Sequence, residues 1–395
     1  MTNNKNFAVI GHGSFGSVWS SDIEDNPESN LSSVIDTDSI SDDDVPGSPT
    51  IKQEDYTEAV EVYHDEAGDL DYEVTDEDLL EDLSDIDQAV VATDTDAHFE
   101  LGLALAEAGV DMMLEKPPTE SPEETELLLE AVNENDVETG VNMIERQHPA
   151  YRAGQEVFGD EDIGRMFNYR SKDLRGNERG KGGGEGSRII MEDLIHDLSE
   201  IEGLTEAGLR NAAVEEAEIE RWSEIGDFPY NTDVSAEASI QYDDGTSVDM
   251  QGSFADEERR YFIAVNEEES KAVYVNTLSR DHISPQAAVI DGEKEVGYLE
   301  RVAREGLILG DEIQEELLES LDADRLEDEM EDYVPESKYV DGKPKFGWAP
   351  VYNQVEQMAS DEEPVSSLEE VLGYQKTIKE IYKESGKPSA ANPKW

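Results

Sequence analysis

Three glycines follow the first apolar segment of the chain. Residues 6–10 (Asn-Phe-Ala-Val-Ile) predict a buried strand that ends at a glycine. In such a strand–turn–helix pattern, the first glycine allows a tight turn and the second lets the backbone approach a pyrophosphate. The third lets the helix pack closely on the strand, and the helix N-terminus faces the negative charge. The residues of this predicted dinucleotide turn are Gly11, His12, Gly13, Ser14, Phe15 and Gly16.

An acidic residue stands where such a site needs one. Asp36 ends the second predicted strand, Leu31–Ile35, and lies 20 residues after Gly16. A carboxylate at this position accepts hydrogen bonds from both ribose hydroxyls and repels a 2′-phosphate, so NAD is expected in preference to NADP. The alternative is a structural glycine turn beside an ordinary surface acid, because the chain has 98 Asp and Glu residues.

A lysine follows another predicted strand. The segment Glu115-Lys116-Pro117-Pro118 comes directly after the apolar run Met112–Leu114. Open α/β sheets bind ligands at the carboxyl ends of their strands, so Lys116 is a candidate ligand of a substrate. The alternative is a solvated lysine in a turn, although lysine is scarce in this chain.

A histidine with acidic neighbours is the candidate for proton transfer. If residues 190–197 are helical, Glu192 and Glu200 share a helix face with His196. Carboxylates there favour the imidazolium and orient the ring, which suits a general base working near neutral pH. The alternative is a half-buried structural histidine with a carboxylate neighbour.

Cations gather in the middle of the chain, where residues 171–187 are rich in Gly, Lys and Arg. They could bind an acidic substituent of a substrate, such as a uronate or a nucleotide diphosphate, or they could form a basic loop that pairs with nearby acids. The side chains available for the first role are Arg146, Tyr151, Arg170, Lys172, Arg175 and Arg179.

Predicted strands alternate with predicted helices over residues 1–144, which indicates a doubly wound, mostly parallel sheet. Residues 37–58 are expected to form an exposed loop because they are rich in Asp and Ser and contain two prolines. The further predicted strands are 88–92, 112–114 and 140–144, and the predicted helices begin at Thr75, His98 and Ser121.

The second half has a different pattern, with strands that are expected to pair as antiparallel neighbours. Residues 238–242 and 247–251, joined through Asp243-Asp244-Gly245, predict a hairpin. The other expected elements are strands at 261–265, 272–275 and 287–290, an acidic helical insertion within 307–345, and a closing helix near 366–385 with Ser366 and Glu369 as a capping box.

The predicted fold is therefore an α/β Rossmann domain followed by an α+β domain with an open, mainly antiparallel sheet. The expected boundaries are 1–146 for the NAD-binding domain and 147–395 for a substrate-binding and oligomerisation domain. The pattern shows no internal repeat and no coiled-coil heptad.

Composition restricts the possible functions. The chain has no cysteine, which excludes disulfides, cysteine-bound metals and thiol nucleophiles, and no metal site is expected. The formal net charge of −68 argues against nucleic-acid or anionic-membrane partners. No apolar stretch is long enough to span a membrane and Met1–Phe7 is unlike a signal peptide, so a cytoplasmic protein is expected.

The acidic residues are spread through segments that keep an apolar periodicity, such as 99–105 and 127–132. This distribution indicates a folded protein of a salt-accumulating, halophilic organism, because about molar salt screens repulsion between surface carboxylates. Substantial disorder is the alternative that composition alone allows.

Taken together, these motifs resemble the Gfo/Idh/MocA family (glucose–fructose oxidoreductase and inositol dehydrogenase). The resemblance covers most of residues 5–205 and includes the glycine turn, the segment 88–93 with His98 opening a helix, and Glu115-Lys116-Pro117. It also includes Arg146-Gln147-His148-Pro149 and the His196 helix. The Glu-Lys-Pro segment after a Rossmann half is its most specific element.

The resemblance implies a nicotinamide-dependent sugar or polyol oxidoreductase. In the family, the lysine of Glu-Lys-Pro holds the substrate hydroxyl and a histidine in an Asp-x-Gly-x-His-type motif accepts its proton, roles that fall on Lys116 and His196. Here Glu192 replaces the aspartate and Leu194 replaces the glycine. The further residues expected at the cofactor are Thr93, Asp94, His98 and Glu115, and those at the substrate are Arg146, His148, Tyr151, Arg170 and Asp193.

Two functions follow as hypotheses. The first is a dehydrogenase that moves a hydride between NAD and a secondary alcohol of a sugar, polyol or sugar derivative. The second is a sensor that keeps the fold and the nucleotide but has lost turnover, which the Glu192 and Leu194 replacements favour. A third reading, an acidic scaffold, requires the apolar periodicity to be accidental. Because the second sheet is open on one face, the resemblance also suggests a homodimer or homotetramer.

Overall fold

The computed structural model describes residues 4–387 except for 42–43, 65–69, 76–82, 160, 172–192, 206–211, 222–232, 254–258, 279–284, 305–317, 322, 341 and 361. The chain divides into two compact units. The first comprises Met1–Ile144 with Val351–Leu372, and the second comprises Glu145–Pro350 with Gly373–Trp395.

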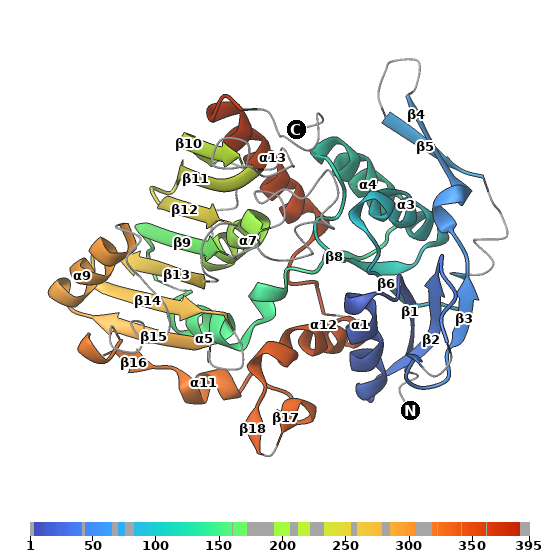
Figure 1. The fold of residues 1–395 in the computed structure, drawn as a ribbon, viewed down its shortest axis with the longest axis horizontal. Coiled ribbons are helices and arrows are strands. Elements are labelled where there is room, and N and C mark those ends of the chain that lie inside the picture. Colours follow the sequence, from blue (N-terminus) through green and yellow to red (C-terminus); the bar gives the residue numbers. More distant parts are fainter. Residues whose placement is uncertain are drawn as a thin grey trace. The chain divides into compact units, whose positions relative to one another are not determined.

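A six-stranded, all-parallel sheet forms the centre of the first unit, with the strand order β3-β2-β1-β6-β7-β8 (Figure 1). This order and the alternating helices confirm the predicted doubly wound Rossmann fold. The strands are β1 (Lys5–Ile10), β2 (Ser29–Asp36), β3 (Thr50–Gln53), β6 (Gln88–Val91), β7 (Asp111–Leu114) and β8 (Thr139–Val141).

Helices cover both faces of this sheet. On one face α1 (Ser14–Asp25) and α12 (Ala349–Ala359) pack against β1, whose Phe7 and Val9 join Trp19 and Val355 in one buried cluster. On the other face lie α3 (His98–Ala108) and α4 (Pro122–Glu134). Alternate side chains of a strand point to opposite faces, so the continuous apolar runs of β1 and β6 are what two covered faces require.

The local signals that predicted the helix ends are present in the structure. Gly109 adopts a left-handed conformation with φ +70° directly after α3. The Ser121 hydroxyl oxygen accepts the Glu124 N–H at 3.3 Å and caps α4. The Glu124 carboxylate accepts the N–H of Glu120 at 3.0 Å rather than that of Ser121, so the motif is only half of a capping box.

The expected exposed loop at 37–58 is wrong in part. It contains β3, which pairs in parallel with β2, and a 3-10 helix Tyr56–Ala59 whose Tyr56 and Ala59 are buried. After it comes an unpredicted antiparallel hairpin of β4 (Val60–His64) and β5 (Leu70–Val74). The helix expected from Thr75 falls mainly on residues outside the described part of the chain.

An eight-stranded sheet forms the centre of the second unit, in the order β10-β11-β12-β9-β13-β14-β15-β16. All pairs are antiparallel except β9 with β12, which confirms the mainly antiparallel prediction. The strands are β9 (Arg165–Ser171), β10 (Ala213–Arg221), β11 (Asp233–Gln241), β12 (Ser247–Ser253), β13 (Arg259–Asn266), β14 (Lys271–Asn276), β15 (Gln286–Asp291) and β16 (Asp324–Arg325).

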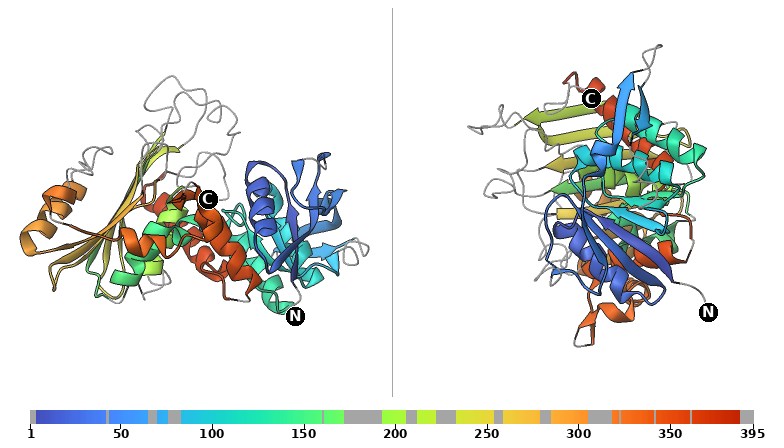
Figure 2. Two further views of the ribbon diagram at one scale, coloured as in Figure 1. Left: turned by 90° about the horizontal axis from the view of Figure 1, so that it is seen from below. Right: turned by 90° about the vertical axis from the view of Figure 1, so that its right-hand side faces the viewer.

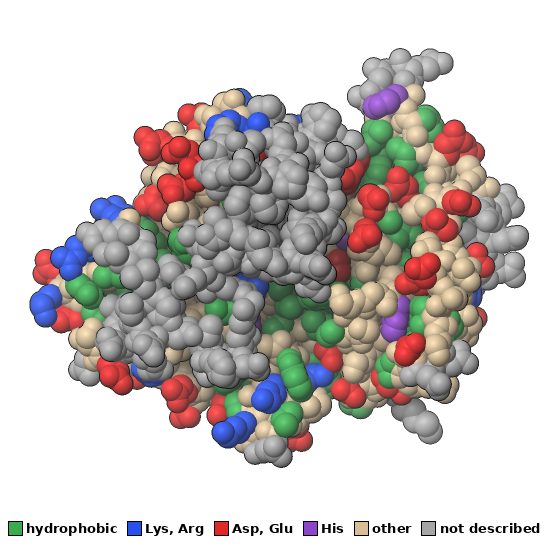
Figure 3. Space-filling view, in the orientation of Figure 1, with side chains coloured by type: hydrophobic (Ala, Val, Ile, Leu, Met, Phe, Trp, Pro, Cys, Tyr) green, Lys and Arg blue, Asp and Glu red, His purple; other side chains and the backbone are tan. Residues whose placement is uncertain are grey.

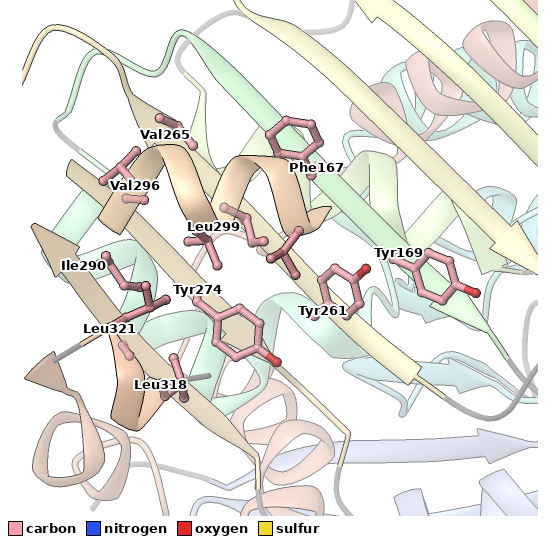
Figure 4. Packing of buried hydrophobic residues seen from close by; sticks show 14 residues of the cluster. Phe167, Tyr169, Tyr261, Val265, Tyr274, Ile290, Val296, Leu299, Leu318 and Leu321 are labelled. Carbon is pink, nitrogen blue, oxygen red and sulfur yellow. The ribbon is translucent and has the colours of Figure 1, made fainter. Parts of the chain in front are cut away.

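Two layers flank this sheet at β13–β15. On one face α9 (Glu293–Arg304) covers a cluster in which the rings of Tyr169, Tyr261 and Tyr274 stack in sequence (Figure 4). On the other face α5 (Pro149–Phe158) packs against β14 and β15, and α7 (Ile195–Leu204) packs against β9. The left panel of Figure 2 shows α9 and α5 on opposite sides of this sheet.

The remaining predicted elements of the second half are present with shifted ends. The hairpin β11–β12 turns at Gly245, whose φ is +101°. Within the insertion, described residues form the edge strand β16, a short helix, α11 (Glu327–Glu331), a 3-10 helix Glu336–Lys338, and a small hairpin of β17 (Tyr339–Val340) and β18 (Lys343–Pro344). None of the described helices is long and apolar enough to cross a membrane.

The closing helix α13 (Leu368–Glu384) begins one residue later than predicted. Its capping box is formed by Ser367 and Glu370, not by Ser366 and Glu369. The Ser367 hydroxyl oxygen accepts the Glu370 N–H at 3.2 Å, and the Glu370 carboxylate accepts the Ser367 N–H at 2.7 Å. The correction follows from burial, because Ser366 is 2% exposed and its backbone carbonyl accepts the Val141 N–H.

The Ser367 cap provides a test of the fold. Ser367→Ala removes the acceptor of one helix-terminal N–H and should lower the free energy of unfolding by about 1 kcal/mol. Urea unfolding followed by circular dichroism at fixed salt measures the change. Ser337→Ala, at an exposed serine in the segment Glu336–Lys338, is the control. Equal stability of the two variants would contradict the capping role.

Candidate functional site

The glycine turn after β1 is shaped by two close backbone approaches. Gly11 has φ +86° and its N–H donates to the Ile35 carbonyl at 2.8 Å. A Cβ on Gly16 would lie 1.9 Å from the Gly11 carbonyl oxygen, so only glycine lets α1 pack this closely. A Cβ on Gly13 would meet no atom within 4 Å. The turn is therefore closed beneath Gly16 and open at Gly13.

Asp36 is held beside this turn by its own strand. Because β1 and β2 are parallel neighbours, Asp36 follows Ile35 at the same edge of the sheet at which Gly11 follows Ile10. One carboxylate oxygen accepts the His12 N–H at 2.6 Å and the other accepts the Asp38 N–H at 2.9 Å. These two bonds fix the carboxylate against the glycine turn and leave further lone pairs for a ligand.

A cleft of about 430 Å³ opens over these residues. Among the residues predicted at the cofactor, those that line it are Gly11, Gly13, Ser14, Phe15, Asp36, Thr93 and Asp94. Residues that the sequence analysis missed bring further acids and an aromatic ring into the lining. They are Asp38, Glu54, Asp55 and Tyr56, and three of them follow the unrecognised strand β3.

The other residues predicted at the cofactor support the cleft from behind. His12 offers its backbone N–H to Asp36, and Gly16 packs under Gly11. The ring nitrogens of His98 lie 2.9 Å from the Pro117 carbonyl and 3.1 Å from the Thr93 carbonyl. Burial lowers the pKa of His98 against the effect of those carbonyls, and a neutral ring has one N–H to donate. His98 therefore lies between two loops at the sheet edge and donates to the carbonyl of one of them.

Glu115 positions the loop that carries Lys116. One oxygen of its carboxylate accepts hydrogen bonds from the Trp19 indole at 2.9 Å and from the Asn142 side chain at 2.7 Å. Burial raises the pKa of Glu115, and the hydrogen bonds and the charge of Lys116 oppose that rise. Asn142 is itself held by Gln354 of α12 at 2.5 Å. The half-buried Lys116 therefore follows β7 on a loop anchored to both α1 and β8.

His196 lies in the first turn of α7 in the second unit and is 6% exposed. Leu194, which replaces the glycine of the family pattern, is fully buried immediately before the helix, and Asp193 is half-buried. Glu192, Lys172, Arg175 and Arg179 lie outside the described residues.

The structure gives Arg170 and Tyr151 partners within the protein. Arg170 is 4% exposed, and its guanidinium contacts carboxylates of Glu145, Asp197 and Glu200. The Tyr151 hydroxyl donates to the Glu200 carbonyl at 2.9 Å, and burial raises the pKa of Tyr151. Arg146 is half-buried beside Gly203. Of the cations predicted to meet substrate, Arg170 is thus used inside the protein.

His148 presents one ring nitrogen for binding. Its Nδ1 accepts the Ala150 N–H at 3.2 Å and caps α5, so the proton of a neutral ring is on Nε2. Burial lowers the pKa of His148 to about 4, with Glu145 opposing and Arg260 adding to that shift. Its Nε2 is buried and has no hydrogen-bond partner among the described residues. A buried, neutral donor of this kind is suited to a polar ligand group.

Residues 5–143 match the model of an oxidoreductase family with an NAD-binding Rossmann fold, Gfo/Idh/MocA. This is the stretch that contains the glycine turn, the acidic cleft and Lys116. No curated protein sequence matches the chain. The first part of the chain is therefore similar to the NAD-binding Rossmann fold that this family's description names.

Solved structures share the fold over the whole chain. UDP-N-acetylglucosamine 3-dehydrogenase from Acidithiobacillus ferrooxidans has a TM-score of 0.64 at 15% identity, over 96% of this chain and 97% of that one. Aldose–aldose oxidoreductase from Caulobacter crescentus has a TM-score of 0.66 at 12% identity, covering 97% and 98%. Myo-inositol 2-dehydrogenase from Lactobacillus plantarum has a TM-score of 0.63 at 14% identity, covering 98% of both chains. These neighbours are oxidoreductases, and at such identities they show the fold.

Substitution by alanine should have different effects at Gly16 and at Gly13. Gly16→Ala places a methyl group against the Gly11 backbone and should lower the free energy of unfolding by about 2 kcal/mol or more. Gly13→Ala should leave thermal unfolding unchanged and weaken NAD binding, because its Cβ would point into the open side of the turn. Thermal melts and calorimetric titration with NAD separate the two effects. Equal losses of stability would contradict this geometry.

Proposed function

We propose that the chain is a dehydrogenase that transfers a hydride between NAD and a secondary alcohol of a sugar, polyol or sugar derivative. The observation that carries the proposal is the glycine turn, closed by Gly16 and flanked by the fixed carboxylate of Asp36, in the stretch matched to an NAD-binding family. Lys116 at the carboxyl edge of the same sheet adds a group suited to a hydroxyl ligand.

The acidic lining of the cleft supports NAD as the preferred cofactor. Asp36 can accept hydrogen bonds from ribose hydroxyls, and a 2′-phosphate there would meet its negative charge. Asp38, Glu54 and Asp55 line the same cleft and add negative charge to that of Asp36. The described lining contains no Lys or Arg that would compensate a phosphate.

Replacing the central carboxylate should relax this preference. Asp36→Asn keeps an acceptor oxygen for the His12 N–H but removes the charge, so the ratio of the NADP and NAD dissociation constants should fall at least tenfold. Asp94→Asn is the matched control, because it removes one carboxylate from the same cleft on the turn after β6. Titration calorimetry with both nucleotides gives the ratio without a substrate. A ratio that is unchanged in Asp36→Asn would rule out this basis of selectivity.

The catalytic roles follow from the family pattern and the chemistry of the side chains. NAD supplies the hydride acceptor when bound. Lys116 would hold the substrate oxygen, and His196 would take the hydroxyl proton as the carbon loses hydride. The positive charge of Lys116 stabilises negative charge that develops on that oxygen. Glu192 would orient the hydroxyl, and the neutral Nε2–H of His148 would donate to another substrate oxygen.

Removing the base should separate catalysis from cofactor binding. His196→Ala should lower NADH formation at least ~100-fold, the scale of general base catalysis, and leave the NAD dissociation constant unchanged. The assay uses a panel of sugars, polyols and sugar acids in molar KCl. His64→Ala, at an exposed histidine of β4, is the control and should retain full turnover. A His196→Ala variant with the wild-type rate would exclude His196 as the base.

A second function, a sensor that binds NAD and a sugar without turnover, is favoured by the buried Leu194 and the Glu192 replacement. Leucine at a glycine position removes backbone freedom in front of α7. The same assay distinguishes the two functions. A wild-type protein that binds NAD with no turnover on any of these substrates would support the sensor.

We also infer a homodimer or homotetramer, with residues 147–395 as the substrate-binding and oligomerisation domain. A groove of about 540 Å³ runs over β9–β12 on the α9 side of the second sheet, and Tyr169, Met250 and Glu237 are among its lining residues. A sheet face of this kind is suited to a partner subunit.

The composition supports a cytoplasmic protein of a salt-accumulating organism. On the face that Figure 3 shows, carboxylates lie on described residues of both units. The chain nevertheless buries ordinary apolar cores in each unit. At about molar salt the Debye length is roughly 3 Å, which removes most of the repulsion of a −68 net charge.

A further inference from the structure

One carboxylate of the second unit is buried between two arginines and has no role in the chemistry above. Glu145 follows β8 in the segment Ile144–Gln147 and is 3% exposed. Its Oε1 accepts hydrogen bonds from Arg170 at 3.1 Å and from Arg260 at 2.7 Å. Burying an ion costs free energy unless its partners compensate for the lost water. The burial of the Glu145 carboxylate between two arginines therefore indicates a specific role.

Arg170 connects Glu145 to the helix that carries His196. From β9 its Nε donates to Asp197 at 2.7 Å, and its Nη2 lies 3.5 Å from Glu200. Asn168, two residues earlier on β9, donates to the same Glu200 oxygen at 3.1 Å. Asp197 is the residue directly after His196. The first turns of α7 are therefore clamped to β9 by two nitrogens of one guanidinium, and its third nitrogen, Nη1, donates to Glu145.

The three carboxylates around Arg170 differ in their charge. Burial by itself raises the pKa of Glu145, but the positive charges of Arg260 and Arg170, and of His196 when its ring carries a proton, hold it well below its ordinary value. Burial raises the pKa of Asp197 to about 6 and that of Glu200 to about 8, in each case against the charge of Arg170. Glu145 is thus the most firmly ionised member of the group.

His196 needs a negative charge nearby if it is to take up a proton. It is the second residue of α7, and the positive end of a helix dipole disfavours an imidazolium in the first turn. The ionised Glu145 acts in the opposite direction, because Arg170 joins it at 3.1 Å to Asp197, the residue directly after His196, at 2.7 Å. In turn, the charge of a protonated His196 lowers the pKa of Glu145.

We propose that Glu145 and Arg170 are positioning residues for the base: Arg170 clamps α7 to β9, and Glu145 supplies the buried negative charge that favours a proton on His196. The inference rests on the proposed role of His196. The charged or titratable residues around Glu145, Arg170 and His196 come from the segment before α5, from β9, from β13 and from α7 with the residues before it. They are Glu145, His148, Arg170, Arg260, Asp193, Asp197 and Glu200.

The test follows the ring titration of His196 by NMR of ¹⁵N-histidine-labelled protein without substrate, with its signal assigned by its loss in His196→Ala. The chain has six histidines, so the spectrum is simple. In Glu145→Gln the midpoint should move to lower pH by about one unit, the scale of a neighbouring charge. In Arg260→Gln it should move to higher pH, because Glu145 is then less neutralised.

The second variant also covers the case in which Glu145→Gln does not fold, because the Arg260 side chain is 31% exposed and easier to replace. Glu300→Gln is the matched control. It removes the carboxylate of α9 that accepts a hydrogen bond from Arg165 at 3.1 Å. Arg165 lies on β9, as Arg170 does, and this change should leave the His196 midpoint unchanged. A folded Glu145→Gln with the wild-type midpoint, or a midpoint in Arg260→Gln that falls or does not move, would overturn the proposal.

The titration needs no turnover, so it separates this inference from the proposed function. If the wild type is active, the acid limb of the kcat/KM profile should shift with the NMR midpoint in both variants. If the wild type is inactive on every substrate, the dehydrogenase proposal fails while the midpoints still decide the role of Glu145. An active wild type with midpoints that do not move would leave the function standing and remove this inference.

Discussion

The parallel register of four strands determines where every candidate group of the first unit lies. Ile10 of β1 is paired with Ile35 of β2 and with Val91 of β6, and Val91 is paired with Leu114 of β7. The residues after these strand ends therefore leave the sheet together. They are the first glycine of the turn, Asp36, the Ala92–Thr93 turn and the loop with Lys116. Backbone hydrogen bonds of 2.7–2.9 Å continue the ladder one residue beyond the strands at Gly11, Ala92 and Glu115.

The second unit depends instead on how buried charges are compensated. The chain has only 30 Lys and Arg against 98 Asp and Glu, and several of these cations are paired with carboxylates beside the sheet. Arg170 with its three carboxylates is the most enclosed case, and Lys271 with Glu161 at 2.6 Å is a half-exposed one. Surface carboxylates are solvated and screened by salt, whereas buried ones require a specific partner. In this acidic chain, a buried Lys or Arg therefore marks a carboxylate that needs a specific partner, whereas a surface Asp or Glu does not.

Much of the first unit could be predicted because its signals are local. The glycine turn, the left-handed Gly109 and the capping serine at 121 each depend on a few adjacent residues. The strand β3 could not be found this way, because a four-residue segment with half-exposed and exposed side chains becomes a strand only by pairing with β2. Missing β3 also concealed Glu54, Asp55 and Tyr56, which reach the cleft only because that strand lies at the edge of the sheet.

The sequence by itself determined the alternation of strands and helices over most of the first unit, the glycine turn with Asp36, and the candidates Lys116 and His196, because these follow from periodicity and short spacing. Only the tertiary structure decided what the individual polar side chains contact. Arg170, expected at a substrate, is enclosed by Glu145, Asp197 and Glu200. His98, expected at the cofactor, lies between the Pro117 and Thr93 carbonyls. Residues as far apart as 145, 170, 197 and 260 meet only when the sheet and α7 assemble, so no local pattern could have predicted their ion pairs.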